Sequence, residues 1–219
     1  MPVTYLISST AGTDTAGTTL VINKPSGTAD GNLLVAFVGH SNNSGYGTPP
    51  AGWTLGVRNF RAECYWKVAS GEGADYTWTF PSGKSIATIA RLSGARSSGP
   101  IGFSAISTTI SSSSTLVPAA TPPEPNTLLL VYATTLAASA DAFITAPHVE
   151  STTGTPCTAA ANYSTGFMAQ DLNWRALSSA AATNNFSTAC EADVSSTIGI
   201  SIILLPATPK FGLFFGSTF

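Results

Sequence analysis

The stretch that decides the fold opens with Gly31-Asn32-Leu33-Leu34-Val35-Ala36-Phe37-Val38, a run that is apolar at nearly every position. A strand of this kind is expected to be buried on both faces, as in the centre of a sheet. From residue 60 the sequence alternates, which places successive side chains on opposite faces of a strand. We predict a core face made of Phe60, Ala62, Cys64, Trp66 and Val68. The opposite face is predicted to point outward, with Arg61, Glu63, Tyr65 and Lys67.

Two more segments and a turn complete this stretch. Tyr76-Thr77-Trp78-Thr79-Phe80 alternates with its aromatic residues on one face, and Ile86 to Leu92 is a second apolar run. Pro49-Pro50-Ala51-Gly52 is typical of a turn, because proline restricts φ and glycine tolerates positive φ. This turn delivers Trp53 to the next strand, and a first strand is predicted over residues 19–22. The pattern throughout is that of a β-sheet.

The second half of the chain repeats this plan loosely. The segment 125–132 resembles 31–37 with Leu128 in the place of Leu33, Trp174 matches Trp66, and the final strand 198–204 resembles 86–92. Two small sandwiches or two halves of one sandwich would both produce such a repeat. We favour one sandwich, because each half offers too few strands to cover its own apolar face.

We therefore predict an all-β protein, a jelly-roll-like antiparallel β-sandwich with a loose internal two-fold repeat. Residues 1–206 are expected to form one domain with halves 1–117 and 125–206, and residues 207–219 an extended apolar C-terminal arm. The connection between the halves is expected to run through the serine-rich tract 107–114 and the proline-rich segment 118–125. Helical signal is weak, being confined to residues 137–142 and 176–182.

Composition narrows the classes of function. Charged residues make up only 9% of the chain, against roughly 25% in typical soluble domains, and the net charge is −2. A surface covered by serine, threonine, asparagine and glycine suits a protein packed against neighbours. No cluster of Lys or Arg is present to bind nucleic acid or anionic lipid. No apolar run reaches the roughly 18 residues that a bilayer requires, so we expect neither nucleic acid nor a membrane as a partner.

No catalytic set or cofactor motif is visible. The two histidines, His40 and His148, fall in or beside predicted loops, and no nucleophile motif accompanies them. The acidic residues Glu63, Glu72 and Asp75 are expected to be solvated surface groups rather than a glycosidase pair. We therefore expect no enzyme activity, no catalytic residue, no metal site and no cofactor.

Three cysteines form neither a disulfide framework nor a zinc pattern. The alternation around Cys64 predicts a core thiol. Cys157 and Cys190 would pair only if their segments lie side by side, and the sequence leaves this open.

Aromatic side chains offer a possible site for sugars. Trp66 and Trp78 are expected in the core and Trp53 against its turn, which leaves Tyr46 and Tyr65 as candidate contacts to a glycan.

The C-terminal arm carries the clearest sign of a protein contact. Five large apolar side chains follow the last predicted strand, at Phe211, Leu213, Phe214, Phe215 and Phe219. Left in water they would form an exposed apolar patch, and such patches usually mark an interface. The arm is expected either to insert into a neighbouring subunit, which we favour, or to fold back onto its own sandwich.

The blocks at residues 31–37, 49–54, 65–69 and 76–79 resemble, in order and spacing, a recurring β-sandwich module of tailed-bacteriophage virion proteins. In that family they read G-D-L-L-x-A-F, P-P-x-G-W-T, Y-x-K-V-A and Y-T-W-T. The resemblance covers about residues 30–95; Asn32 replaces the usual Asp, and Leu92 stands where an aromatic residue is common. Such modules occur in capsid decoration proteins, tail components and receptor-binding fibres, and the blocks carry no catalytic residue.

The resemblance implies a structural protein of the virion, assembled in the cytoplasm of a bacterial host. We expect it to decorate or cement the capsid exterior through its low-charge faces and its arm, with other capsid or tail subunits as partners. A homo-oligomer is expected, with a trimer as one candidate state. The alternative is a tail or fibre component that binds a host glycan as an adhesin.

Overall fold

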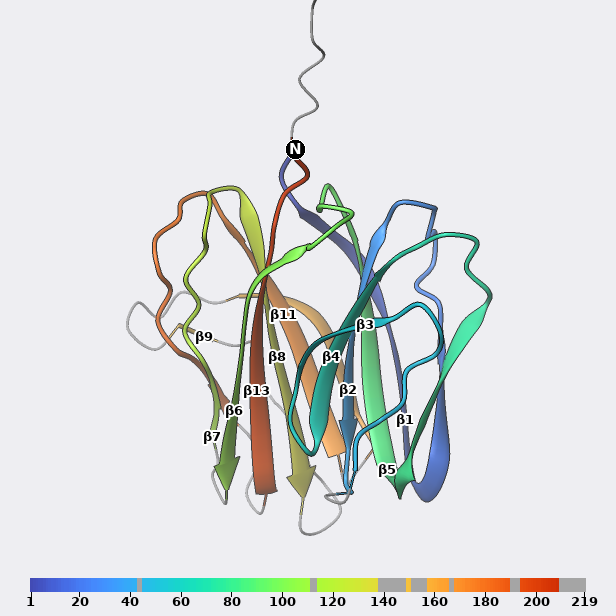
Figure 1. The fold of residues 1–219 in the computed structure, drawn as a ribbon. Helices are drawn as coiled ribbons and strands as arrows, with labels where there is room; N and C mark the ends of the chain where they lie inside the picture. Colours follow the sequence, from blue (N-terminus) through green and yellow to red (C-terminus); the bar gives the residue numbers. More distant parts are fainter. Residues whose placement is uncertain are drawn as a thin grey trace, which may run out of the picture.

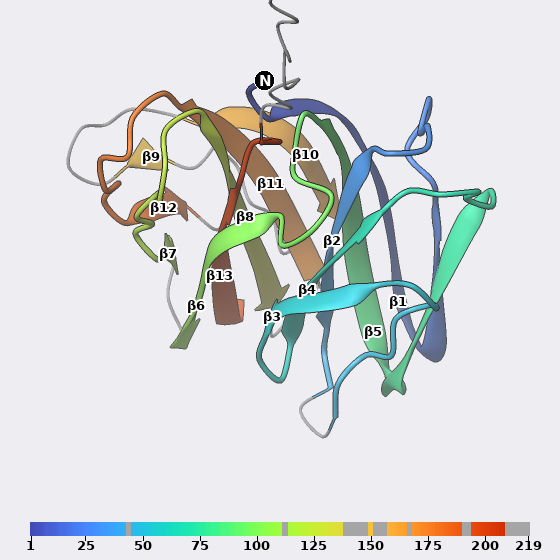
Figure 2. The same ribbon diagram turned by 45° about the horizontal axis from the view of Figure 1, so that its top comes forward.

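The computed structural model describes residues 1–42, 45–110, 114–137, 149–150, 157–165, 168–189 and 194–208. These residues form strands and connecting loops, and none of them lies in a helix. Two five-stranded antiparallel sheets pack face to face, and a three-stranded sheet lies beside them (Figures 1 and 2). The prediction of an all-β sandwich is confirmed.

The first sheet contains the first five strands of the chain. They are β1 (Thr4–Asn23), β2 (Leu33–His40), β3 (Thr54–Arg58), β4 (Ala62–Val68) and β5 (Asp75–Ser93), in the order β1-β5-β2-β4-β3. The apolar β2 lies between β4 and β5, which explains why it lacks alternation. The predicted first strand, residues 19–22, is only the end of the much longer β1.

The second sheet is built from the rest of the chain, in the order β10-β11-β8-β13-β6. Its strands are β6 (Ile101–Ile110), β8 (Thr127–Ala137), β10 (Thr158–Ser164), β11 (Met168–Leu177) and β13 (Val194–Leu204). The small sheet has the order β7-β12-β9 and contains β7 (Ser114–Val117), β9 (Val149–Glu150) and β12 (Phe186–Ala189). The first five strands stay in one sheet, so this strand order supports a sandwich without adding support for a jelly roll.

The two large sheets share one topology, which confirms the predicted repeat. Read from its β6 edge, the second sheet has the order β6-β13-β8-β11-β10. These strands correspond one by one to β1-β5-β2-β4-β3 of the first sheet. The register agrees as well: Val35 lies between Trp66 and Ala90, and the equivalent Leu130 lies between Trp174 and Ile202. The edge strand β1 of the first sheet contacts β10 of the second, and the other edge strand β3 contacts β6. Each edge strand therefore faces the strand that is not its equivalent.

The main core lies between the two sheets and receives side chains from both repeats. Its buried members are Val3, Leu33, Val35, Phe37, Ala62, Cys64, Ala90, Leu92, Leu128, Leu130, Tyr132, Leu172, Ile198, Ile200, Ile202 and Leu204. Burial of this apolar surface is the main force that holds the sheets together.

Each sheet also buries its outer face. On the first sheet, residues 19–23 of β1 pair with residues 75–79 of β5, beyond the part of β5 that pairs with β2. These ends and Trp53 cover the outer face of the sheet. They form a second core, whose buried members include Leu20, Ile22, Leu34, Ala36, Val38, Tyr65, Tyr76, Trp78 and Phe80. On the second sheet, Val117 and Phe186 of the small sheet, together with Cys157, cover Leu129, Val131 and Ile203. The molecule is therefore layered beyond a simple two-sheet sandwich.

Three local predictions are wrong. β4 begins at Ala62, so Phe60 lies in the preceding turn and is 60% exposed instead of being in the core. The second core covers the face predicted to point outward, so Glu63 and Tyr65 are buried. The change from one sheet to the other comes between Ser93 and Ile101, earlier than the predicted connection, because residues 101–110 already form β6.

Candidate functional site

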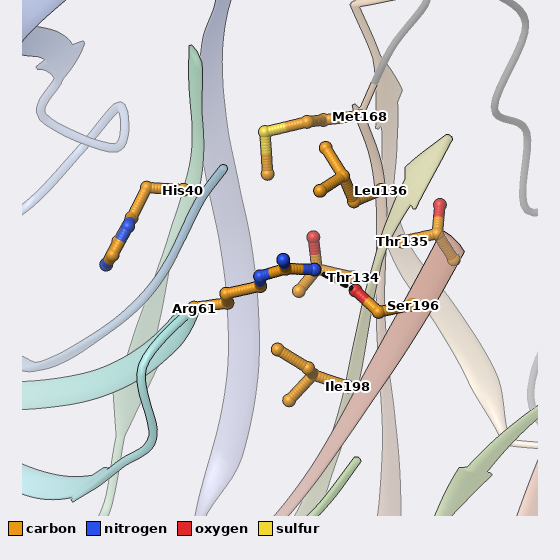
Figure 3. A pocket seen from close by; sticks show the side chains of 8 residues that line it. All are labelled: His40, Arg61, Thr134, Thr135, Leu136, Met168, Ser196 and Ile198. Carbon is orange, nitrogen blue, oxygen red and sulfur yellow. Dashed lines mark hydrogen bonds between the residues drawn. The ribbon is translucent and has the colours of Figure 1, made fainter. Parts of the chain in front are cut away.

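A small cavity lies between the sheets at the end of the sandwich where β2 and β8 end. It has a volume of about 10 Å³ and is lined by residues of both sheets, among them His40, Thr134, Met168 and Ile198 (Figure 3). The Arg61 side chain reaches across from the first sheet and donates a hydrogen bond from Nη1 to Ser196 Oγ at 2.6 Å. Such a space is the size of one water molecule and is too small for a substrate.

His40 beside this cavity is a buried residue rather than the loop residue that the sequence predicted. Its ring contacts Phe80 with centroids 5.5 Å apart, and only 1% of its surface is exposed. Burial lowers the pKa of His40, and the positive charge of Arg61 lowers it further, although a backbone hydrogen bond at Asn42 acts in the opposite direction. The side chain is therefore held neutral, as suits a packed histidine.

An exposed group of stacked side chains lies at the same end of the molecule. The rings of Tyr46 and Phe60 stack with centroids 5.7 Å apart and planes 9° from parallel, and Arg58 Cζ lies 3.9 Å from the centre of the Tyr46 ring. Tyr46 is 39% exposed and Phe60 is 60% exposed. We call these three residues the aromatic stack.

Phe60 is presented by a tight turn between β3 and β4. The Asn59 side chain accepts hydrogen bonds from the backbone N–H groups of Arg61 and Ala62, each at 2.9 Å, through its Oδ1. Its Nδ2 donates to Thr108 Oγ1 at 2.9 Å, which ties the turn to the second sheet. A turn closed in this way holds the exposed ring at a defined position.

Tyr46 is presented by a loop that is held from below by a buried carboxylate. Glu63 Oε1 accepts a hydrogen bond from Gly47 N at 2.8 Å, and the Tyr65 hydroxyl contacts Glu63 Oε2 at 2.8 Å and Gly47 O at 3.1 Å. The next residue, Thr48, exchanges two backbone hydrogen bonds with Thr79 at 2.7 and 3.1 Å. A Cβ added at Gly47 would come within 2.7 Å of Glu63 Oε2 and of Phe80 Cε1, so both buried side chains would have to shift to admit a larger residue.

The protonation of Glu63 reflects its buried position. Burial raises the pKa of this carboxyl, while hydrogen bonds from Tyr65 and Gly47 and the charge of Arg58 lower it in part. Burial and the neighbouring Glu63 together raise the pKa of Tyr65. An acidic group in such a place costs free energy unless its hydrogen bonds compensate, so its main structural effect is to fix the Gly47 backbone.

The segments 49–54, 65–69 and 76–79 meet at the second core. Lys67 Nζ lies 2.8 Å from Glu72 Oε1, the Tyr76 hydroxyl donates to Glu72 Oε2 at 2.8 Å, and Trp53 packs edge-on against Tyr76 at 5.2 Å. Glu72 is thus the acceptor of a closed network and not the solvated acid that was predicted. Burial alone would raise its pKa, but hydrogen bonds from Lys67, Ser70 N and Tyr76 outweigh burial and lower it.

The predicted site residues have different outcomes. Tyr46 lies at the surface, whereas Tyr65 is 3% exposed and cannot be reached by a glycan. The predicted interface residues Phe211, Leu213, Phe214, Phe215 and Phe219, together with His148 and Cys190, lie outside the described residues. Cys64 is a buried thiol whose pKa is raised by burial, as predicted for a core position, and Cys157 is also buried.

Sequence reasoning missed Phe60 and Arg58 as neighbours of Tyr46. The alternating pattern placed Phe60 in the core because it extended the strand by two residues. The signal that could have corrected this is Asn59, a residue that favours turns. No pattern in the sequence brings residue 46 next to residue 60, since that contact depends on the path of the intervening loop.

No group of three or more His, Cys, Asp or Glu side chains in the described part of the chain is placed to hold a metal ion. Within the same residues, no helix has the length and apolar character needed to cross a membrane. No known protein family, curated protein or solved structure matches the chain.

Proposed function

We propose that this chain is a non-enzymatic structural protein of a bacteriophage particle, and that it decorates or cements the capsid exterior. The resemblance of residues 30–95 to virion modules supports this assignment. Trp53 and Tyr76 of these blocks belong to the second core, and Lys67 Nζ lies over both of their rings. These block residues therefore serve packing, which agrees with a structural role.

One observation carries the proposal: the root of the C-terminal arm is fixed. Ala207 N donates to Gly94 O at 2.7 Å, and Arg96 donates from Nε to Pro206 O at 3.1 Å. Arg96 is itself held by Glu124, with Nη2 2.7 Å from Oε1. An apolar segment that starts from a fixed point can reach a neighbouring subunit with little loss of entropy at its base.

We expect attachment to neighbouring subunits to use the ends of the sandwich and the C-terminal arm rather than the sheet faces. Both outer sheet faces carry buried apolar clusters, and the large apolar side chains that remain exposed in the described residues lie on several separate elements. An interface of about 800 Å² per partner, at roughly 25 cal/mol per Å² of apolar surface, is sufficient for stable attachment after the cost of association. We infer a homo-oligomer, with a trimer as one candidate, or contact with other capsid subunits; a tail or fibre position is the alternative.

The test compares the full chain with a chain ending at Thr208. Purified particles from a culture that makes this protein, stripped of it, are mixed with either form and sedimented. A second variant keeps the length of the arm but replaces its five large apolar residues by serine. We expect both altered proteins to melt at the same temperature as the full chain and to lose attachment. Undiminished attachment of either form would contradict the role of the arm, and immunogold microscopy that labels no particle would contradict the virion assignment.

A further inference from the structure

We propose that the aromatic stack is a carbohydrate-binding site, in which the ring of a sugar lies on the open face of Phe60. Stacked aromatic rings offer a flat apolar surface for the C–H groups of a pyranose, and the guanidinium of Arg58 can donate hydrogen bonds to its hydroxyl or carboxylate oxygens. Tyr46 supports both partners, since Phe60 stacks on it and Arg58 lies over it. This inference does not depend on the proposed role of the arm.

The first argument is that the site is preorganised. Glu63 is 0% exposed and accepts a hydrogen bond from the backbone N–H of Gly47, next to Tyr46. Asn59 fixes Phe60 in the same manner from the other side. Two exposed rings are thus held in one geometry before any ligand arrives, which reduces the entropy lost on binding.

The second argument is the size of the apolar surface. The other large hydrophobic residues that are exposed in the described chain are Met1, Leu6, Ile7 and Val21 at or along β1, Leu55 near the start of β3, and Leu116 on β7. Two rings bordered by amide and hydroxyl groups, such as those of Asn59 and Thr108, match one or two sugar rings. A protein interface would need a larger apolar centre.

The third argument is charge. Arg58 is exposed and contacts Tyr46, while the neighbouring carboxylate of Glu63 is buried and occupied by its hydrogen bonds. One accessible cation is enough to orient hydroxyl or carboxylate groups of a sugar. A nucleic-acid site would need several cations along a groove, and the whole chain has only nine Lys and Arg residues.

The position of the site fits a molecule that is attached at its opposite end. β2 begins near the fixed root of the arm, because Leu33 pairs with Leu92, two residues before Gly94, whose carbonyl oxygen accepts the hydrogen bond from Ala207 N. The strand ends at His40, shortly before Tyr46. At about 3.3 Å per residue, the eight residues of β2 separate the two ends, so a sugar could bind without obstructing the root of the arm.

The experiment measures binding of the full chain to a panel of immobilised oligosaccharides containing neutral hexoses and uronic acids, followed by calorimetry with the best ligand. Phe60→Ala and Tyr46→Ala are each expected to lower the affinity by roughly tenfold or more. Arg58→Ala should lower it too, most strongly for uronic acids and less so at high salt. Val21→Ala, which removes an exposed side chain elsewhere, is the matched control and should change nothing.

Binding that disappears with Phe60→Ala in a protein of unchanged melting temperature would support the site. The proposal is overturned if no oligosaccharide binds at millimolar concentration, or if binding survives the loss of both rings. It is also overturned if sedimentation shows that Phe60→Ala abolishes self-association of a chain that binds no sugar, because the stack would then be a protein contact.

Discussion

Phe37 and Tyr132 occupy equivalent positions of the two repeats, and their rings stack on each other across the sandwich, with centroids 4.7 Å apart and planes 13° from parallel. Phe37 lies in the middle of β2 between Cys64 and Thr88, and Tyr132 lies in the middle of β8 between Leu172 and Ile200. The approximate two-fold relation of the sheets therefore passes close to this contact. Both side chains are fully buried, so the main core is organised around a pair of corresponding residues.

Truncation at this contact should destabilise the whole domain. Phe37→Ala removes a buried ring that joins the first sheet to Tyr132 of the second, and we expect a loss of about 3–5 kcal/mol of unfolding free energy. Phe37→Leu keeps most of the volume and should cost less. Chemical denaturation measures both, with Val21→Ala as the exposed control, for which a change within about 0.5 kcal/mol is expected. A loss below about 1 kcal/mol for Phe37→Ala would mean that the sheets do not depend on this stack.

The pKa of Glu63 predicts how stability responds to pH. Because burial raises this pKa in the folded protein, the folded state binds the proton more tightly than the unfolded state does. The contribution to stability is therefore greatest below the ordinary carboxyl pKa and is lost as pH rises through the raised value. Glu63→Gln should resemble the protonated form, so its melting temperature should gain on the wild type as the pH rises from acid to neutral. A difference between the two proteins that is the same at every pH would contradict this assignment.

Glu72 is expected to show the opposite dependence. Its pKa is lowered because the hydrogen bonds from Lys67, Ser70 and Tyr76 outweigh burial, so its contribution is present above the ordinary pKa and is lost as pH falls through the lowered value. Glu72→Gln should lose about 1–3 kcal/mol at neutral pH and little in acid. Glu124→Gln is the matched control: its ion pair with Arg96 is about one-third exposed, and less than about 1 kcal/mol is expected. Equal losses for both variants would show that burial of the pair does not matter.

Gly199 on β13 marks the place where the small sheet touches the second large sheet. A Cβ at this position would meet Leu116 O and lie 2.8 Å from Val117 Cα, so β7 would have to move away. Gly199→Ala should therefore destabilise the protein by roughly 1–3 kcal/mol. Gly17→Ala on β1 is the control, because the nearest atom to its added Cβ is Thr15 O at 3.9 Å. Thermal unfolding that responds equally to both substitutions would rule out close packing of β7 as the cause.

The layout of strands could largely be predicted from the sequence, because apolar runs and alternation are local consequences of strand geometry. The match of Leu33 with Leu128 and of Trp66 with Trp174 was also visible, and the register of the two sheets agrees with it. The candidate site could be predicted only in part. Tyr46 stood out as an aromatic residue in a polar loop, but nothing local indicated that Arg58 and Phe60 would join it.

What the sequence by itself determined was the class of fold, the repeat and the central position of β2, since periodicity in side-chain polarity is imposed by the geometry of a single strand. What only the tertiary structure decided was which faces are covered and which residues meet. Alternation shows that Glu63 and Tyr65 share a face, but that face is buried because the far ends of β1 and β5 and the loop before Trp53 pack over it. Burial depends on contacts between segments that are distant in the sequence. For this reason alternation alone could not show that Phe60 is exposed and Glu63 is buried.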